Sequence, residues 1–400
     1  MARLISGKKG KQAPRYRSLI LIGVVCVLLA AAGVTWLLTR DNSGSSEPDP
    51  PGPDISTQTP EPPPGQTVTP SPTPTQTPEP APEPTPDPTP EPPYTGPVNP
   101  LTGLPMEEAL TKNRPIAISV GNTSDALPAN GVSAADIIYE LPVESATRLL
   151  AIYQDITSVP KIGSIRSTRH YTAQIAEYHD AILVSIGGSP LGLIYVRDRR
   201  IPHIEETPGI VIRDSNRVSG RRMVSPNNAV MLGERMKNWL PERSYRIVHE
   251  DDFDLGFKFV EDGTPQNGSD AVDILLRFEA GNTSTFRYDA DKKTYSYHKY
   301  GRQVVDANDN SNPAFTNLIV IRTSVSSLQG QHGGAGRREI VTTGSGEGYF
   351  ICGGKYIEID WHRVDTEPFK FTHKDGTDLE FGKGRVYIAV TPTNSNHDFK

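Results

Sequence analysis

The distribution of proline limits how much of this chain can fold. Of the 37 Pro residues in the 400-residue sequence, 22 lie between positions 41 and 100. Proline fixes φ and has no backbone N–H group to donate, so a segment this rich in proline forms neither a helix nor a sheet. The segment also carries nine acidic residues, no Lys or Arg and almost no apolar side chains. It cannot bury enough surface to offset the entropy lost on folding, so we expect a disordered linker over residues 41–98.

The linker is expected to act as an extended spacer. From Thr69 to Pro93 it approximates an alternation of Thr-Pro and Glu-Pro, which favours polyproline II at about 3.1 Å per residue, so the segment 41–100 would reach up to about 180 Å. The alternative is a proline motif recognised by another domain. The spacer is better supported, because no basic residue flanks the Pro runs.

A membrane anchor is predicted before the linker. Residues 1–18 carry six Lys or Arg residues, and residues 19–38 carry no charge. A helix of that length spans about 30 Å, which matches the hydrocarbon thickness of a bilayer. The positive charge before it predicts that residues 1–18 form a cytoplasmic tail. We expect a single-pass protein of the cell membrane whose carboxy-terminal bulk faces the cell-wall side.

Two alternatives to an uncleaved anchor stay open. A cleaved signal peptide would have a shorter apolar core followed by a small-residue site. Ala30-Ala31-Ala32 could supply such a site, but the apolar run continues to Leu38. Lipidation would need a Cys at the end of the apolar core, and Cys26 lies in its middle. The uncleaved helix is therefore the main interpretation.

The remaining residues predict an α+β fold in two parts. Residues 99–241 read as a mixed α/β domain and residues 242–400 as a β-rich domain. In the first part, strands are expected over 114–120, 137–141, 148–154 and 181–186, and helices over 168–178 and 229–240. Residues 101–400 hold 34 basic and 38 acidic residues, and this near balance gives no indication of nucleic-acid binding.

An ordered series of short motifs resembles the bacterial YerB-like family of lipoproteins, extracytoplasmic proteins of unknown function. The series includes Asn99-Pro100-Leu101-Thr102-Gly103, Ala135-Asp136-Ile137-Ile138-Tyr139-Glu140, Lys161-Ile162-Gly163-Ser164-Ile165-Arg166-Ser167-Thr168-Arg169, Gly187-Gly188-Ser189-Pro190, Arg213-Asp214, Pro226-Asn227-Asn228 and Gly336-Arg337-Arg338. The resemblance covers about residues 99–392. It implies a mixed α/β amino-terminal part joined to a β-rich carboxy-terminal part, and it carries over no catalytic residues.

This chain departs from the family pattern at two positions. The family tends to have His where this chain has Ser185, and His between the Pro and Asn where this chain has Asn227. If those His residues act as ligands or bases in relatives, this protein lacks them.

Arg residues in segments predicted to be structured suggest a site for an anion. The guanidinium group presents a planar set of donors that suits carboxylates and phosphates. The candidate ligand-binding residues are Glu140, Glu144, Arg148, Arg166, Arg169, Ser189, Arg213 and Arg217. The alternative is internal ion pairing, in which Glu140 and Glu144 neutralise Arg148 and Arg166.

Other chemistry has weaker support in the sequence. Ser189 follows a predicted strand, but Leu191 breaks the Gly-x-Ser-x-Gly spacing of a nucleophile elbow, and His170 is expected on a helix surface. No His-x-x-x-His or His-Glu-x-x-His pattern predicts a metal site, and no loop predicts a nucleotide cofactor.

Two functions from different classes follow. The first is a cell-envelope binding or scaffold module for an anionic wall polymer or partner protein. The second is a hydrolase or transferase that modifies wall polymers and uses Glu140 or Glu144 as acid or base. The first is favoured, because no recognised nucleophile, metal set or cofactor loop is found.

Overall fold

The computed structural model describes residues 94–218, 221–334 and 336–400. These residues lie in one compact unit that runs from Pro88 to Lys400. The predicted cytoplasmic tail and membrane anchor, and the linker up to residue 93, lie outside the described residues. Of the helices in the described ranges, none combines the length and the apolar character needed to cross a membrane.

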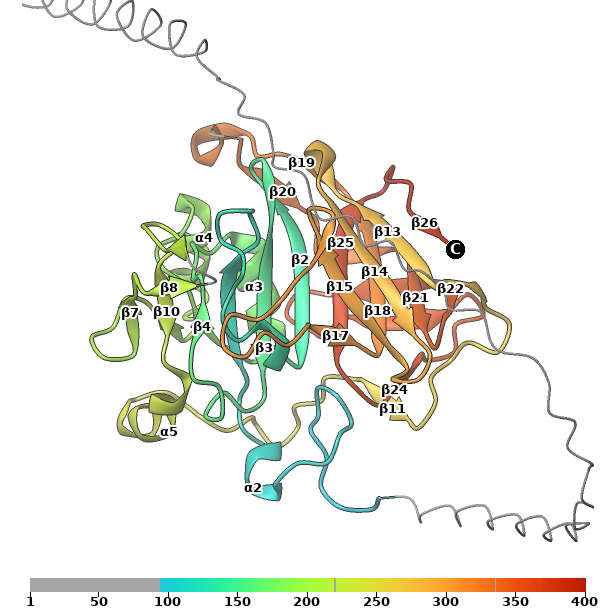
Figure 1. Cartoon of the computed structure of the whole chain (residues 1–400), viewed down its shortest axis with the longest axis horizontal. Coiled ribbons are helices and arrows are strands. Elements are labelled where there is room, and N and C mark those ends of the chain that lie inside the picture. Colours follow the sequence, from blue (N-terminus) through green and yellow to red (C-terminus); the bar gives the residue numbers. More distant parts are fainter. Residues whose placement is uncertain (1–93, 219–220, 335) are drawn as a thin grey trace, which may run out of the picture. The chain divides into compact units, whose positions relative to one another are not determined.

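An eleven-stranded mixed sheet forms the centre of this unit (Figure 1). Its strand order is β12-β22-β21-β18-β25-β2-β3-β1-β5-β6, with β23 paired to β22. One half consists of β1 (Ile116–Gly121), β2 (Ile137–Val143), β3 (Ala146–Tyr153), β5 (Ile182–Val184) and β6 (His203–Ile204). The other half consists of β12 (Ser269–Asp270), β18 (Asn317–Thr323), β21 (Gly344–Cys352), β22 (Lys355–Arg363), β23 (Lys370–His373) and β25 (Val386–Pro392).

A parallel pairing of β2 with β25 joins the two halves, with Ile137 opposite Val386 and Glu140 opposite Ala389. Every residue of both strands is buried, as expected for central strands covered on both faces. Strands from both sides of position 241 therefore share one sheet. The division into domains 99–241 and 242–400 stays a prediction.

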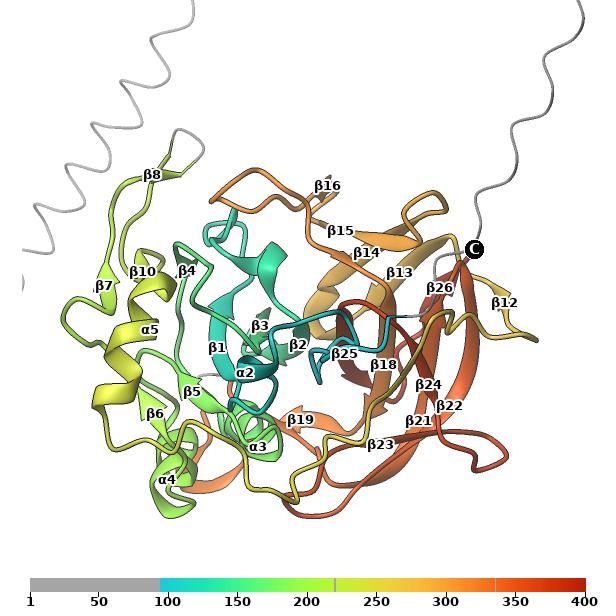
Figure 2. The ribbon, with the colours of Figure 1, turned by 90° about the horizontal axis from the view of Figure 1, so that it is seen from below.

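A second sheet covers one face of the large sheet. Its order is β16-β15-β14-β13-β26, with β17 paired to β15. The bounds are β13 (Asp273–Arg277), β14 (Thr283–Asp289), β15 (Thr294–Lys299), β16 (Arg302–Gln303), β17 (Ala314–Phe315) and β26 (Asp398–Phe399). Figure 2 shows β13–β15 on one side of the central strands and α3 on the other. Side chains such as Phe286 and Tyr297 pack with Tyr387 between the two sheets.

Helix α3 (His170–Tyr178) covers the opposite face of the large sheet. Tyr171, Ile175 and Tyr178 recur at helical spacing and are buried there, which confirms the predicted helix. The helix begins two residues later than predicted, with Arg169 as its N-cap. Helix α4 (Pro190–Asp198) follows. The Ser189 side chain accepts a hydrogen bond from the Gly192 N–H and Pro190 occupies the first turn, an arrangement that starts a helix.

The helix predicted over residues 229–240 is wrong in its first part. Residues Ala229–Met231 form β10, which pairs with β4 (Ile162–Gly163) and β7 (Val211–Arg213). Only Met236–Trp239 form an α-helix, α5. The backbone hydrogen bonds available from two neighbouring strands outweigh the local helical preference.

The mixed α/β part followed by a β-rich part is confirmed by the order of elements. Among the described residues, every α-helix, from α2 (Glu108–Thr111) to α5, precedes residue 241. The remaining short strands are β8 (Arg217–Val218), β9 (Arg221–Arg222), β11 (Lys258–Val260), β19 (Val325–Ser327), β20 (Arg338–Ile340) and β24 (Glu380–Gly382).

Candidate functional site

Two of the sequence motifs lie side by side at the end of the large sheet. The Ile186 N–H donates to the Arg166 carbonyl at 3.2 Å, and the Thr168 N–H donates to the Gly187 carbonyl at 3.0 Å. The Arg166 N–H in turn donates to the Ser119 carbonyl in β1 at 2.8 Å. These backbone bonds fix the segment that carries Arg166 and Arg169 against a central strand.

Three of the predicted Arg residues converge here, and we call Arg148, Arg166, Arg169 and Glu144 the arginine cluster. Arg148 and Arg169 both donate from Nη1 to the Ser167 carbonyl, at 2.6 and 3.4 Å. Arg166 donates from Nη1 to Asn227 Oδ1 at 2.8 Å. Arg148 comes from β3, whereas Arg166 and Arg169 precede α3, so folding brings cations from separate segments together.

The cluster holds more positive than negative charge. Glu144 forms a salt bridge with Arg169, with Oε1 to Nη2 at 2.6 Å. In the described part of the chain, Arg148 and Arg166 have no such carboxylate partner. Burial, followed by the nearby Arg169, lowers the pKa of Arg148 to about 9, and the same two causes lower the pKa of Arg166. The alternative of internal ion pairing therefore holds for Glu144 in part: it is paired within the protein, but with Arg169 rather than with Arg148 or Arg166.

Arg338 adjoins the arginine cluster and was not among the predicted site residues. Its Nη2 donates to the Glu144 carbonyl at 3.3 Å, and its Nε lies 2.9 Å from Glu279 Oε2. Arg338 belongs to the motif Gly336-Arg337-Arg338, which is visible in the sequence. No feature of the neighbouring sequence indicates that Arg338 contacts Glu144.

Glu140 does not belong to the arginine cluster. Its side chain is fully buried and its Oε1 lies 2.6 Å from Lys299 Nζ in β15. Its other hydrogen-bond partners are Asn122, Thr147, Ser284, Tyr297 and Tyr387. Burial is the largest influence and would raise the pKa of Glu140. The charge of Lys299 and the hydrogen bonds from Lys299, Thr147 and Tyr387 together outweigh burial, so the pKa lies below its ordinary value. The expected pairing with an Arg is wrong, and a carboxylate buried in this way cannot reach a wall polymer as an acid or base.

The remaining predicted site residues either lie apart from the arginine cluster or form structural contacts with the backbone. Ser189 caps α4 and is buried. Arg213 is exposed and pairs with Glu206 at 3.2 Å, and Arg217 begins β8. His170 is buried rather than on the surface, with its Nε2 3.1 Å from Glu339 Oε1.

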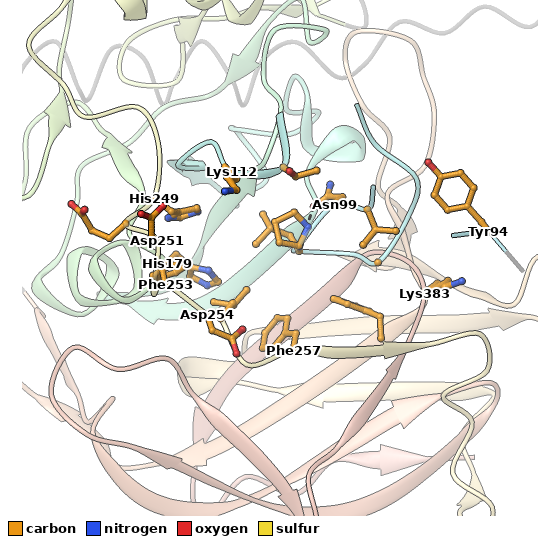
Figure 3. Close-up of a pocket in the computed structure, with 18 residues that line it drawn as sticks. Tyr94, Asn99, Lys112, His179, His249, Asp251, Phe253, Asp254, Phe257 and Lys383 are labelled. Carbon is orange, nitrogen blue, oxygen red and sulfur yellow. Dashed lines mark hydrogen bonds between the residues drawn. The ribbon is translucent and has the colours of Figure 1, made fainter. Parts of the chain in front are cut away.

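A cavity of about 410 Å³ lies elsewhere, between residues 94–112 and the connection that follows residue 248 (Figure 3). None of the predicted site residues lines it. Phe253 and Phe257 form apolar walls, and the His249 ring stacks on Phe253 at 4.1 Å. Burial lowers the pKa of His179, another lining residue, to about 3. Among the residues that the structure describes, no group of three or more His, Cys, Asp or Glu side chains is placed to hold a metal ion, here or elsewhere.

Comparisons with known proteins agree with the resemblance seen in the sequence. The family model described as "Protein of unknown function (DUF3048) N-terminal domain" matches residues 101–246. The model described as "Protein of unknown function (DUF3048) C-terminal domain" matches residues 274–388. The chain is 28% identical over 298 residues to "Putative lipoprotein YerB" of Bacillus subtilis (strain 168), over 73% of this chain and 86% of that protein. The crystal structure of YerB from Bacillus subtilis matches with a TM-score of 0.64 and 25% identity, over 75% of this chain and 99% of that one.

Proposed function

Because this chain belongs to the YerB-like family, whose two parts are described as the N- and C-terminal domains of DUF3048, we propose that it is an extracytoplasmic binding module held at the cell membrane. In this proposal residues 19–38 form a single-pass helix, residues 41–98 a spacer, and the arginine cluster a site for an anionic polymer or partner protein of the cell envelope.

The membrane location is supported by two observations. The relative from Bacillus subtilis carries the word lipoprotein in its name. This sequence has an uncharged run of suitable length after six basic residues, which is typical of a membrane helix with a cytoplasmic amino terminus. A lipid and a helix would both keep the folded part at the membrane surface.

The excess of cations in the arginine cluster carries the proposal of an anion site. Three guanidinium groups surround one carboxylate, and Arg148 is only 6% exposed. Buried charges without counter-ions are costly, so a bound anion would lower the energy of the cluster. Arg166 is half-buried and would contact the anion directly. The more deeply buried Arg148 would add electrostatic attraction without touching the anion.

Guanidinium groups bind carboxylates and phosphates through charge-assisted hydrogen bonds. In a cell wall, these groups are supplied by peptide carboxylates and by teichoic phosphates. The ligand class is therefore an anionic wall polymer, or an acidic surface of an envelope protein.

Sedimentation with cell-wall sacculi tests the proposal. The full-length chain in detergent should pellet with sacculi, and the bound fraction should fall as salt screens the attraction. The double substitution Arg166→Gln and Arg169→Gln should weaken binding about tenfold or more, because it removes two charged hydrogen-bond donors.

Arg213→Gln is the matched control, since it removes an exposed Arg that pairs with Glu206 outside the cluster. It should bind sacculi as the wild type does. If the double variant also sediments as the wild type does, the arginine cluster is not the binding site.

A further inference from the structure

A cavity of about 290 Å³, lined by both polar and apolar side chains, adjoins the arginine cluster. The two features share Asn227, which accepts a hydrogen bond from Arg166 and also lines the cavity. The uncharged polar side chains of the lining are five amides and one hydroxyl: Asn130, Asn216, Asn227, Asn228, Asn308 and Ser164. None of the candidate residues expected from the sequence lines this cavity.

Two buried polar atoms in this lining have no hydrogen-bond partner among the described residues. They are Ser164 Oγ and Asn228 Oδ1, in side chains that belong to residues only 3% and 8% exposed. Such orphaned groups are rare in native proteins, because each loses its hydrogen bonds to water on burial. Because they lie in the wall of a cavity, both atoms are available to hydrogen-bond a bound molecule.

The cavity wall is held in place by hydrogen bonds that leave these two atoms free. Asn228 Nδ2 donates to Ser215 Oγ at 3.1 Å, which orients the amide oxygen. The Gly121 N–H donates to the Ser164 carbonyl at 2.8 Å, which ties the backbone of Ser164 to the end of β1. A site assembled from fixed elements binds without a large ordering cost.

A second set of contacts holds the lining residues Asn130, Lys161, Asp214 and Asn308 together. Asn308 Nδ2 donates to the Lys161 carbonyl and Asn308 Oδ1 accepts from Asn130 Nδ2, both at 2.9 Å. Lys161 Nζ and Asp214 Oδ2 form an ion pair at 2.7 Å. The charges of the wall are thus matched, so the lining offers neutral donors and acceptors rather than a net charge.

We propose that this cavity binds a single sugar ring. Each sugar hydroxyl both donates and accepts, and the lining offers hydroxyl and amide groups that do the same. Pro128, Pro160 and Val230 also line the cavity and offer apolar surface to the C–H groups of a ring. The volume is near the lower end of the range for small-molecule sites, which suits one ring. The inference rests on Ser164 Oγ and Asn228 Oδ1, whereas the anion site rests on the guanidinium groups, although both features include Asn227.

Ligand-observed NMR on the full-length chain in detergent tests the inference with two probes, glucose and N-acetylglucosamine. At least one of them should bind saturably. Ser164→Ala should weaken that binding about tenfold, as expected for one lost hydrogen bond. The same variant should unfold at the wild-type temperature or above it, since it removes a buried hydroxyl that has no partner in the protein.

Ser185→Ala is a matched control, because it should affect stability but not sugar binding. Ser185 is also buried, but its hydroxyl lies 2.8 Å from His203 Nε2 and donates to the Gly187 carbonyl at 3.1 Å. This variant should unfold at a lower temperature and bind the probe as the wild type does. Absence of saturable binding by both sugars, or unchanged binding in Ser164→Ala, would overturn the inference.

Discussion

Glu140 illustrates how a single residue can have a role that its sequence position does not reveal. It lies in a run of apolar residues in β2, where a charge is costly unless it is paired. The pairing is supplied by Lys299, and both side chains are fully buried between the two sheets. This ion pair, with its surrounding hydroxyl groups, links the large sheet to the second sheet.

Lys299→Met should strongly destabilise the protein. It leaves the Glu140 carboxylate buried without its counter-ion, at an expected cost of about 3–5 kcal/mol in the free energy of unfolding. Adding Glu140→Gln should recover part of this loss, because the uncompensated charge is then gone. Denaturant unfolding at pH 7 of the two single variants and the double variant measures the effect. A double variant no more stable than Lys299→Met would contradict it.

The sequence indicated which residues of the candidate site carry charge, but not how they pair. Arg166 and Arg169 are close in the chain, and their proximity could be expected. The contact of Glu140 with Lys299 crosses 159 positions, and the contact of Arg338 with Glu144 crosses 194. No local pattern specifies such contacts, because they depend on how whole strands pair.

At the level of elements, sequence patterns predicted two kinds of element correctly. These are a helix, which satisfies its own backbone hydrogen bonds, and strands that run through the core. The predicted strands that correspond to β1, β2 and β3 are mostly apolar segments that run through the core, and α3 has a clear helical spacing. Residues 229–231 were misassigned because strands β4 and β7 lie on either side of them. Helix α4 is not among the predicted helices, although Ser189 at the N-cap and Pro190 in the first turn are residues that commonly start one.

Ser189→Ala should destabilise the protein by about 1 kcal/mol, the usual cost of losing an N-cap. The reason is that the Gly192 N–H would lose its acceptor at 3.1 Å. Thermal or denaturant unfolding measures the change. Ser326→Ala, at an exposed strand position, is the control and should change stability by no more than about 0.5 kcal/mol. Equal stability of the two variants would show that the cap contributes nothing.

For the molecule as a whole, buried titratable groups predict a loss of stability in mild acid. Burial lowers the pKa of His179 to about 3 and of His397 to about 4, from 6.5. Below pH 6.5 the unfolded chain takes up protons that the folded state does not, so stability falls as pH decreases. Asp136 opposes this, because burial raises its pKa to about 6 from 3.8, and the folded state then gains a proton first.

His179→Gln separates one contribution from this sum. Unfolding free energies at pH 7.5 and pH 5 should differ less in the variant than in the wild type. The variant's loss of stability between the two pH values should be smaller than the wild type's by at most about 1.4 kcal/mol for each pH unit below 6.5, which is the limit for one proton. The comparison within each protein removes the effect of the substitution at neutral pH. An identical pH dependence in both proteins would show that His179 is not buried in its neutral form.

The order of synthesis adds a constraint that follows from the pairing of β2 with β25. A ribosome releases the chain from its amino terminus, so residues 137–143 emerge long before residues 386–392. Until that late segment is made, β2 and β18 each have an open edge where β25 will insert. Open edges invite pairing with other chains. During synthesis, β2 and β18 must therefore avoid pairing with other chains until residues 386–392 have been made.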